Sequence, residues 1–149
     1  MNPPPPLPPT YRDQRKIDSE HLSLLAIFHY VIAGLAVLGL GFLTLHFGLM
    51  NALMSDPEAW KGSGPNPQMP PPQFIAMFKV FYLVGAVVMV LAMVGNILSG
   101  IFIHRRKHRM FSLVIAGLNC LQIPFGTILG VFTIIVLARD SVRELYEAR

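Results

Sequence analysis

Apolar and polar positions divide the chain into three long apolar runs and the short polar segments around them. The runs are Leu22–Met54, Phe74–Ile103 and Met110–Ala138, and Lys79 is the only Lys, Arg, Asp or Glu inside them. A helix needs about 20 apolar residues to cross the hydrocarbon core of a bilayer, and each run exceeds that length. We therefore predict an all-α membrane protein with three transmembrane helices, at about residues 22–50, 76–103 and 110–138.

The composition points to the same class. Charged residues make up 13% of the 149 residues, against about 25% in soluble domains, and the mean hydropathy is +0.53. No metalloprotease or hydrolase motif and no pair of carboxylates occurs within a run, so we expect neither enzymatic activity nor a cofactor. No basic stripe is interleaved with aromatic residues, so nucleic acid is not an expected partner. The single cysteine, Cys120, excludes an intrachain disulfide.

The chain begins with a polar segment. Residues 1–20 are predicted to form a proline-rich and charged tail on the cytoplasmic side, and residues 21–139 to form the transmembrane helical bundle. Asp18 or Ser19 is placed to cap the first transmembrane helix, because either side chain accepts hydrogen bonds from the free amides of a first turn.

Two further polar segments follow the first and the third runs. Residues 55–73 are rich in proline and glycine and are predicted to form a loop, in which Trp60 suits the head-group level of a membrane. Residues 140–149 are predicted to form a tail with a short amphipathic helix, because one helical face gathers Val142, Leu145 and Tyr146.

The segment His104–Arg109 is the strongest indicator of topology. It carries four fixed positive charges between two apolar runs, and short loops rich in Lys and Arg stay in the cytoplasm. We therefore place this loop and the N-terminus in the cytoplasm. Anionic lipid head groups are expected to contact the basic side chains of this loop, namely Arg105, Arg106, Lys107 and Arg109.

The third run contains Pro124, which interrupts helical hydrogen bonding, so we predict one span kinked at that residue. This topology puts the C-terminus outside, together with the basic residues of the C-terminal tail. A re-entrant alternative avoids that conflict: residues 110–123 and 125–138 would form two half-helices that meet near Pro124 and return the chain to the cytoplasm. The kinked span is favoured, because the basic loop and the first span dominate orientation.

Small residues recur along all three runs and predict close helix packing, since small side chains let helix backbones approach in a membrane. Asn96, at hydrocarbon depth, is expected to hydrogen-bond a neighbouring helix. The pattern suggests a homo-oligomer or a place in a larger membrane complex, and the predicted packing residues are Gly34, Gly41, Gly95, Asn96, Ser99, Gly126 and Gly130.

The segment Ala116–Leu137, with its Pro124-Phe125-Gly126-Thr127 sequence and a continuation to Tyr146, resembles a group of small uncharacterised bacterial membrane proteins. The third hydrophobic segment of that group follows a pattern of the form PFGT-LG-FT-IVL. The stretch His21–Tyr30 is similar to the start of the same group. The resemblance implies a bacterial inner-membrane protein and carries no activity to this chain.

Three functions are compatible with these features. The first is a structural or accessory protein, either a small subunit of a membrane complex or a self-associating bundle. The second is a small oligomeric channel or transporter with a re-entrant segment, whose path would be lined by polar residues of the runs such as Asn96, Asn119, Gln122 and Thr127. The third is a haem protein in which His29 and His46 each pair with a partner's histidine.

Overall fold

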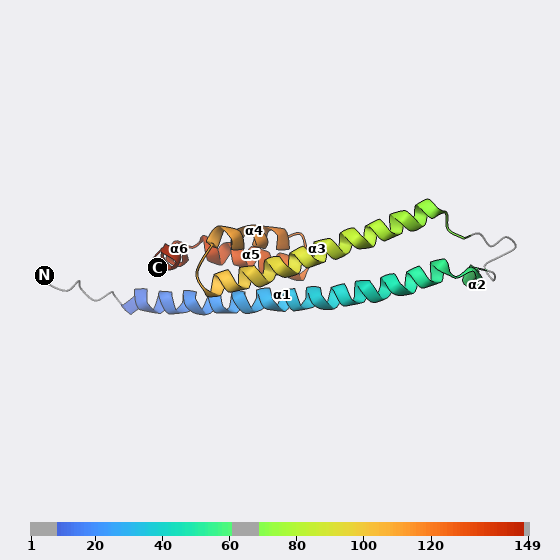
Figure 1. Ribbon diagram of the computed structural model, residues 1–149. Helices are drawn as coiled ribbons and strands as arrows, with labels where there is room; N and C mark the ends of the chain where they lie inside the picture. The colour runs from blue at the N-terminus through green and yellow to red at the C-terminus, as the bar shows by residue number, and fades with distance from the viewer. Residues whose placement is uncertain (1–8, 61–68, 148–149) are drawn as a thin grey trace. The chain divides into compact units, whose positions relative to one another are not determined.

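The computed structural model describes residues 9–60 and 69–147, and these residues form helices joined by short turns, without a strand (Figure 1). The prediction of an all-α protein is confirmed. The helices are α1 (Pro9–Ser55), α2 (Pro57–Trp60), α3 (Pro72–His104), α4 (Arg109–Asn119), α5 (Phe125–Ala138) and α6 (Asp140–Glu147).

Two helices of the described residues are long and apolar enough to cross a membrane: the part of α1 from Asp13 to Ser55, and α3. They contain the spans predicted at 22–50 and 76–103. A third candidate span arises only if α5 and α6, which are bent by 72°, are counted together. The structure therefore supports the membrane class but not a count of three spans.

The first polar segment differs from its prediction. Helix α1 begins at Pro9, so the charged residues of the expected tail belong to the helix, and residues 1–8 lie outside the described part. Asp18 and Ser19 are therefore interior residues of α1 and do not cap it. The reason is tertiary, because Asp18 is fully buried and paired with Arg139 of the segment after α5.

The segment 55–73 is only partly described. Helix α1 continues to Ser55, the short helix α2 follows, and α3 already begins at Pro72. A proline is tolerated at the start of a helix, because the first amides have no intrahelical acceptor. Residues 61–68 and the side chain of Trp60 lie outside the described residues, so the predicted head-group position of Trp60 stays a prediction.

The prediction of one kinked helix at 110–138 is wrong. Helix α4 ends at Asn119 and α5 begins at Phe125, and the two lie side by side as an antiparallel hairpin (Figure 1). Pairs along the hairpin show the direction, since Gly130 faces Ala116 and the Arg109 side chain reaches the Leu137 carbonyl. Two separate helices are present, as in the re-entrant alternative, but the first ends at Asn119 and not at residue 123.

Glycines explain why the chain folds back here. A side-chain carbon added at Gly130 would lie 2.3 Å from the Ala116 carbonyl oxygen, and one added at Gly126 would lie 2.6 Å from the Asn119 carbonyl oxygen. Only glycine permits so close a backbone approach. At the turn, the Thr127 hydroxyl donates to the Cys120 carbonyl at 2.9 Å and so satisfies a group that the end of α4 leaves free.

The described residues divide into two compact units. The first unit contains the chain up to Ala33 and the chain from Val94 onward, and the second unit contains the residues from Gly34 to Met93. The core of the first unit joins α1, α3, α5 and α6, and its buried apolar side chains are Leu22, Leu25, Ala26, Ile103, Leu129, Val136, Leu137, Val142 and Leu145.

Helix α6 buries the face that the sequence predicts. Val142 is fully buried, Leu145 is 8% exposed, and Tyr146 packs against the same core. The tip of the α4–α5 hairpin is different, because its apolar side chains Leu121, Ile123 and Phe125 are 79%, 84% and 68% exposed. Apolar residues this exposed require lipid or a protein partner around them.

The hairpin yields a test of its packing. Gly130→Ala should lower the free energy of unfolding by about 1–3 kcal/mol, because the added carbon meets backbone of α4 that cannot move aside. Gly117→Ala is the matched control, since open space surrounds Gly117 on the same hairpin, and it should be neutral or stabilising by up to about 1 kcal/mol. Circular dichroism during titration with a denaturing detergent measures both. Equal stability of the two variants would contradict the close packing.

Candidate functional site

Five polar side chains are buried together inside the first unit. They come from four helices, and none is more than 1% exposed: His29 of α1, Asn96 and Ser99 of α3, Asn119 of α4 and Thr133 of α5. We call this set the polar network. Unpaired polar groups are costly in apolar surroundings, so the hydrogen bonds within the set decide what it can do.

The centre of the polar network is a reciprocal amide pair between α3 and α4. The Asn96 Nδ2 donates to Asn119 Oδ1 at 3.1 Å, and the Asn119 Nδ2 donates to Asn96 Oδ1 at 2.8 Å. Two bonds in opposite directions orient both amides, which fixes the rotation of each helix against the other.

His29 connects this pair to α1. Its Nδ1 lies 2.8 Å from Asn96 Oδ1. An amide oxygen only accepts, so the Nδ1 of His29 carries the proton and donates it. In the neutral ring Nε2 is then an acceptor, and the hydroxyls of Thr133 and Ser99 lie 3.3 Å and 3.5 Å from it.

The polar network therefore satisfies itself. Both nitrogens of His29 have partners, and no buried side-chain atom of the five residues lacks one. A haem ligated by His29 would have to break these bonds, so the arrangement disfavours that function. Among the described residues, no group of three or more His, Cys, Asp or Glu could hold a metal ion. What the network does chemically is to connect four helices.

The predicted packing residues separate into two groups. Gly95 and Ser99 are buried in the first unit, and a side-chain carbon at Gly95 would lie 2.8 Å from the Ile115 side chain of α4. Gly34 and Gly41 are exposed in the second unit, with nothing of the described chain within 4 Å of an added carbon. These two glycines leave open surface on α1.

The basic loop is built on the end of α3. The Lys107 amide donates to the Phe102 carbonyl at 2.9 Å, and the Arg106 amide donates to the Ile103 carbonyl at 3.1 Å, a pattern that ends many helices. Arg106 has a φ of 52° at the position that glycine usually takes. Its guanidinium donates to the Ser19 hydroxyl at 2.9 Å, so the side chain connects the loop to α1.

The other loop cations are placed as follows. Arg105 and Lys107 are exposed, whereas Arg109 is half-buried and donates to the Leu137 carbonyl at 2.8 Å, which caps the end of α5. Near the same end, Arg139 lies 3.5 Å from the Oδ1 of Asp18, a carboxylate that also accepts from Gln14 at 3.1 Å. The N-terminal part of α1, the end of α3 and the end of α5 thus meet at one end of the first unit.

Tyr146 of α6 lies within the influence of the same cations. Burial raises the pKa of Tyr146 to about 12, while the charges of Arg109 and Arg106 act in the opposite direction. Its hydroxyl is buried without a hydrogen-bond partner. The tyrosine is therefore neutral at physiological pH and serves the packing of α6 against the core.

His46 belongs to the second unit and lies in an aromatic cluster. Its Nδ1 is hydrogen-bonded to the Tyr82 hydroxyl, and its ring stacks on Phe42 and Tyr82. His29 and His46, the two histidines of the haem hypothesis, therefore both form hydrogen bonds with other side chains of the chain.

Sequence reasoning found part of the polar network. The sequence predicts that Asn96 hydrogen-bonds another helix and that Ser99 packs against one, whereas it predicts only a channel-lining role for Asn119 and no role for Thr133. The available signal was that each of these residues, like His29, is an isolated polar residue in an apolar run. The pairing itself depends on how α3 packs against α4, which the pattern of polar and apolar residues does not encode. Comparisons with protein-family models, curated proteins and solved structures find no match.

The amide pair can be tested with a double-mutant cycle. Asn96→Ala and Asn119→Ala should each lower the free energy of unfolding by about 1–2 kcal/mol, because each leaves a buried amide unpaired. The double variant should cost less than the sum, since it removes both members of the pair. Gln122→Ala, at an exposed polar residue of the hairpin tip, is the control and should change little. Additive effects in the double variant would contradict the pairing.

Proposed function

We propose that this protein is an accessory protein of the bacterial inner membrane, a small subunit of a membrane complex or a self-associating bundle without catalysis of its own. The observation that carries the proposal is the self-satisfied polar network. Its hydrogen-bonding groups are used to connect α1, α3, α4 and α5, so they stabilise the fold and are not presented to a substrate.

The proposed topology has two spans and a re-entrant hairpin. Helices of 11 and 14 residues are about 17 Å and 21 Å long at 1.5 Å per residue, and neither crosses a hydrocarbon core of about 30 Å. The N-terminus, the basic loop and the C-terminus then share the cytoplasmic side. This arrangement agrees with the positive-inside rule, because Arg139 and Arg143 join the loop cations there. Within it, the exposed side chains of Arg105 and Lys107 lie at the level of anionic head groups.

A channel with a re-entrant segment is the second candidate, and the hairpin favours it. Re-entrant backbone at membrane depth must be buried in protein or face water. However, Asn96 and Asn119 are buried and paired with each other in the described part of the first unit, so they do not line a path there and any path would lie between copies. Ion flux into proteoliposomes above that of protein-free liposomes would favour this candidate over the accessory role.

Topology is tested by labelling single cysteines in a Cys120→Ala background. With a membrane-impermeant maleimide on intact cells, Asp56→Cys should react, whereas Lys107→Cys and Glu147→Cys should react only after permeabilisation. Lys107→Cys is the cytoplasmic control. Labelling of Glu147→Cys in intact cells would place the C-terminus outside and overturn the re-entrant topology.

Association is tested on the full chain in a mild detergent by light scattering coupled to size exclusion. We expect a mass above that of the monomer, because the exposed glycines of α1 offer a surface for close helix packing. Gly41→Leu should shift the distribution towards the monomer. Gly117→Leu, on the exposed face of the hairpin, is the control. A wild-type monomer that also purifies from its native membrane without a stoichiometric partner would contradict the accessory role.

A further inference from the structure

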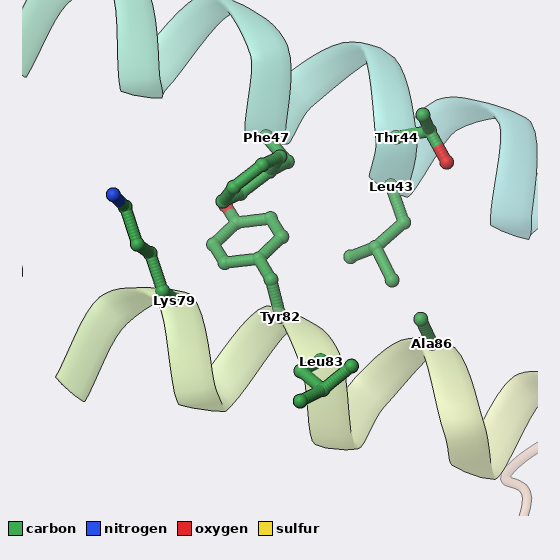
Figure 2. Close-up of a pocket in the computed structure, with 7 residues that line it drawn as sticks. All are labelled: Leu43, Thr44, Phe47, Lys79, Tyr82, Leu83 and Ala86. Carbon is green, nitrogen blue, oxygen red and sulfur yellow. The ribbon is translucent and has the colours of Figure 1, made fainter. Parts of the chain in front are cut away.

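The second unit contains a groove between its two long helices, α1 and α3. The groove has a volume of about 220 Å³, and its lining includes Leu43 and Phe47 of α1 and Lys79, Tyr82 and Ala86 of α3. Figure 2 shows Lys79 and Tyr82 rising from α3 towards α1, with Leu43 and Phe47 on the opposite wall. The lining is mainly apolar, and one of its side chains carries a fixed charge.

Two of the three polar side chains of the groove are already engaged. The Thr44 hydroxyl donates to the Leu40 carbonyl at 2.8 Å, and the Tyr82 hydroxyl is hydrogen-bonded to His46. Lys79 has no hydrogen bond or ion pair with the described residues, and it is exposed. In the described part of the second unit, the only carboxylates are Asp56 and Glu58, which lie outside α1 and α3. An anion that pairs with Lys79 therefore comes from outside the described part of the second unit.

The shape of the groove sets the form of the occupant. Beyond the groove the helices approach each other, because a carbon added at Gly85 would lie 3.7 Å from Leu43 and one added at Gly39 would lie 3.4 Å from Met89. Lys79 lies two turns into α3, about 10 Å from its first residue. A lysine at this depth extends its amine towards the head-group region. The occupant therefore has an anionic head beside Lys79 and an apolar part that reaches inward along Leu43 and Ala86.

We propose that this groove binds one anionic phospholipid, with its phosphate on the Lys79 amine and one acyl chain between α1 and α3. The volume argues against a helix of a partner or of a second copy. A helix is about 10 Å across, whereas the groove holds the volume of about seven water molecules, which suits a segment of an acyl chain. The proposal rests on the membrane placement of α1 and α3 and is independent of the accessory role.

Native mass spectrometry of the full chain, released from detergent with added lipid, tests the proposal. The probes are phosphatidylglycerol, phosphatidylcholine with the same chains, oleate, and glycerol phosphate without chains. Wild type should bind its first molecule of phosphatidylglycerol about fivefold more tightly than its first molecule of phosphatidylcholine. This ratio is the one expected for one lysine that acts on an anionic head group. Glycerol phosphate should not compete, because it lacks the chain that fills the groove.

Four variants locate the site. Lys79→Gln should lose the preference for phosphatidylglycerol, and Lys79→Arg should retain it. Lys107→Gln, which removes an exposed cation of the basic loop, should also retain it. Ala86→Leu narrows the groove but keeps the charge of Lys79, so it should weaken the binding of both lipids at least fivefold. Circular dichroism checks that each variant is folded.

Other outcomes would overturn the proposal. Retention of the preference in Lys79→Gln, or its loss only in Lys107→Gln, would place the lipid on the basic loop. Competition by glycerol phosphate would indicate an anion site without a chain, and tighter binding of oleate would indicate a fatty acid. A dimer that excludes lipid and that Ala86→Leu dissociates would assign the groove to a second copy. Apart from that dimer, these results do not depend on the oligomeric mass of wild type, which tests the accessory role separately.

Discussion

The reciprocal amide pair of Asn96 and Asn119 is the interaction on which the first unit depends. In an apolar environment an unpaired amide is costly, so each asparagine has to find a partner, and the two satisfy each other. The pair orients α3 against α4. The Asn96 side-chain oxygen also accepts a hydrogen bond from the Nδ1 of His29, which belongs to α1. Thr133 completes the chain of bonds on α5. Helices in lipid gain no hydrophobic energy by meeting, so such bonds and close packing carry their association.

Close packing of helix backbones is the second interaction that holds the helices of the first unit together. Gly126 and Gly130 let α5 lie on the backbone of α4, and this approach places Asn119 and Thr133 on the same side of the unit as His29. The hydrogen bonds of the polar network depend on this close packing, because a wider hairpin would separate the hydroxyl of Thr133 from the imidazole of His29. At the charged end the same elements are joined again, by Arg106 to Ser19, by Arg109 to the end of α5, and by Arg139 to Asp18.

The sequence was sufficient for the helical class, for two long apolar helices and for the buried face of α6, because each follows from local periodicity and run length. It was not sufficient for the hairpin. Pro124 breaks helical hydrogen bonding in a kinked span and in a hairpin alike, and the choice depends on whether Gly130 meets Ala116, a contact between distant residues. The start of α1 was missed for a similar reason, since Asp18 looks like a capping residue until Arg139 is brought beside it. The polar network could be predicted only as separate residues, because its bonds join α1, α3, α4 and α5 and exist only once these helices have packed together.

The two units differ in what holds their helices, and this difference has a consequence for lipid. In the first unit, directional bonds between buried groups admit one arrangement, and any separation of the helices would leave several polar atoms unpaired. In the second unit, the contacts between α1 and α3 are made by apolar side chains, small residues, the aromatic cluster around His46 and the hydrogen bond between Tyr82 and His46. Such contacts are weakly directional and exchange for lipid contacts at little cost. We therefore expect the helices to adapt to an acyl chain where few hydrogen bonds join them. The groove beside Lys79 lies in the second unit, where this condition holds.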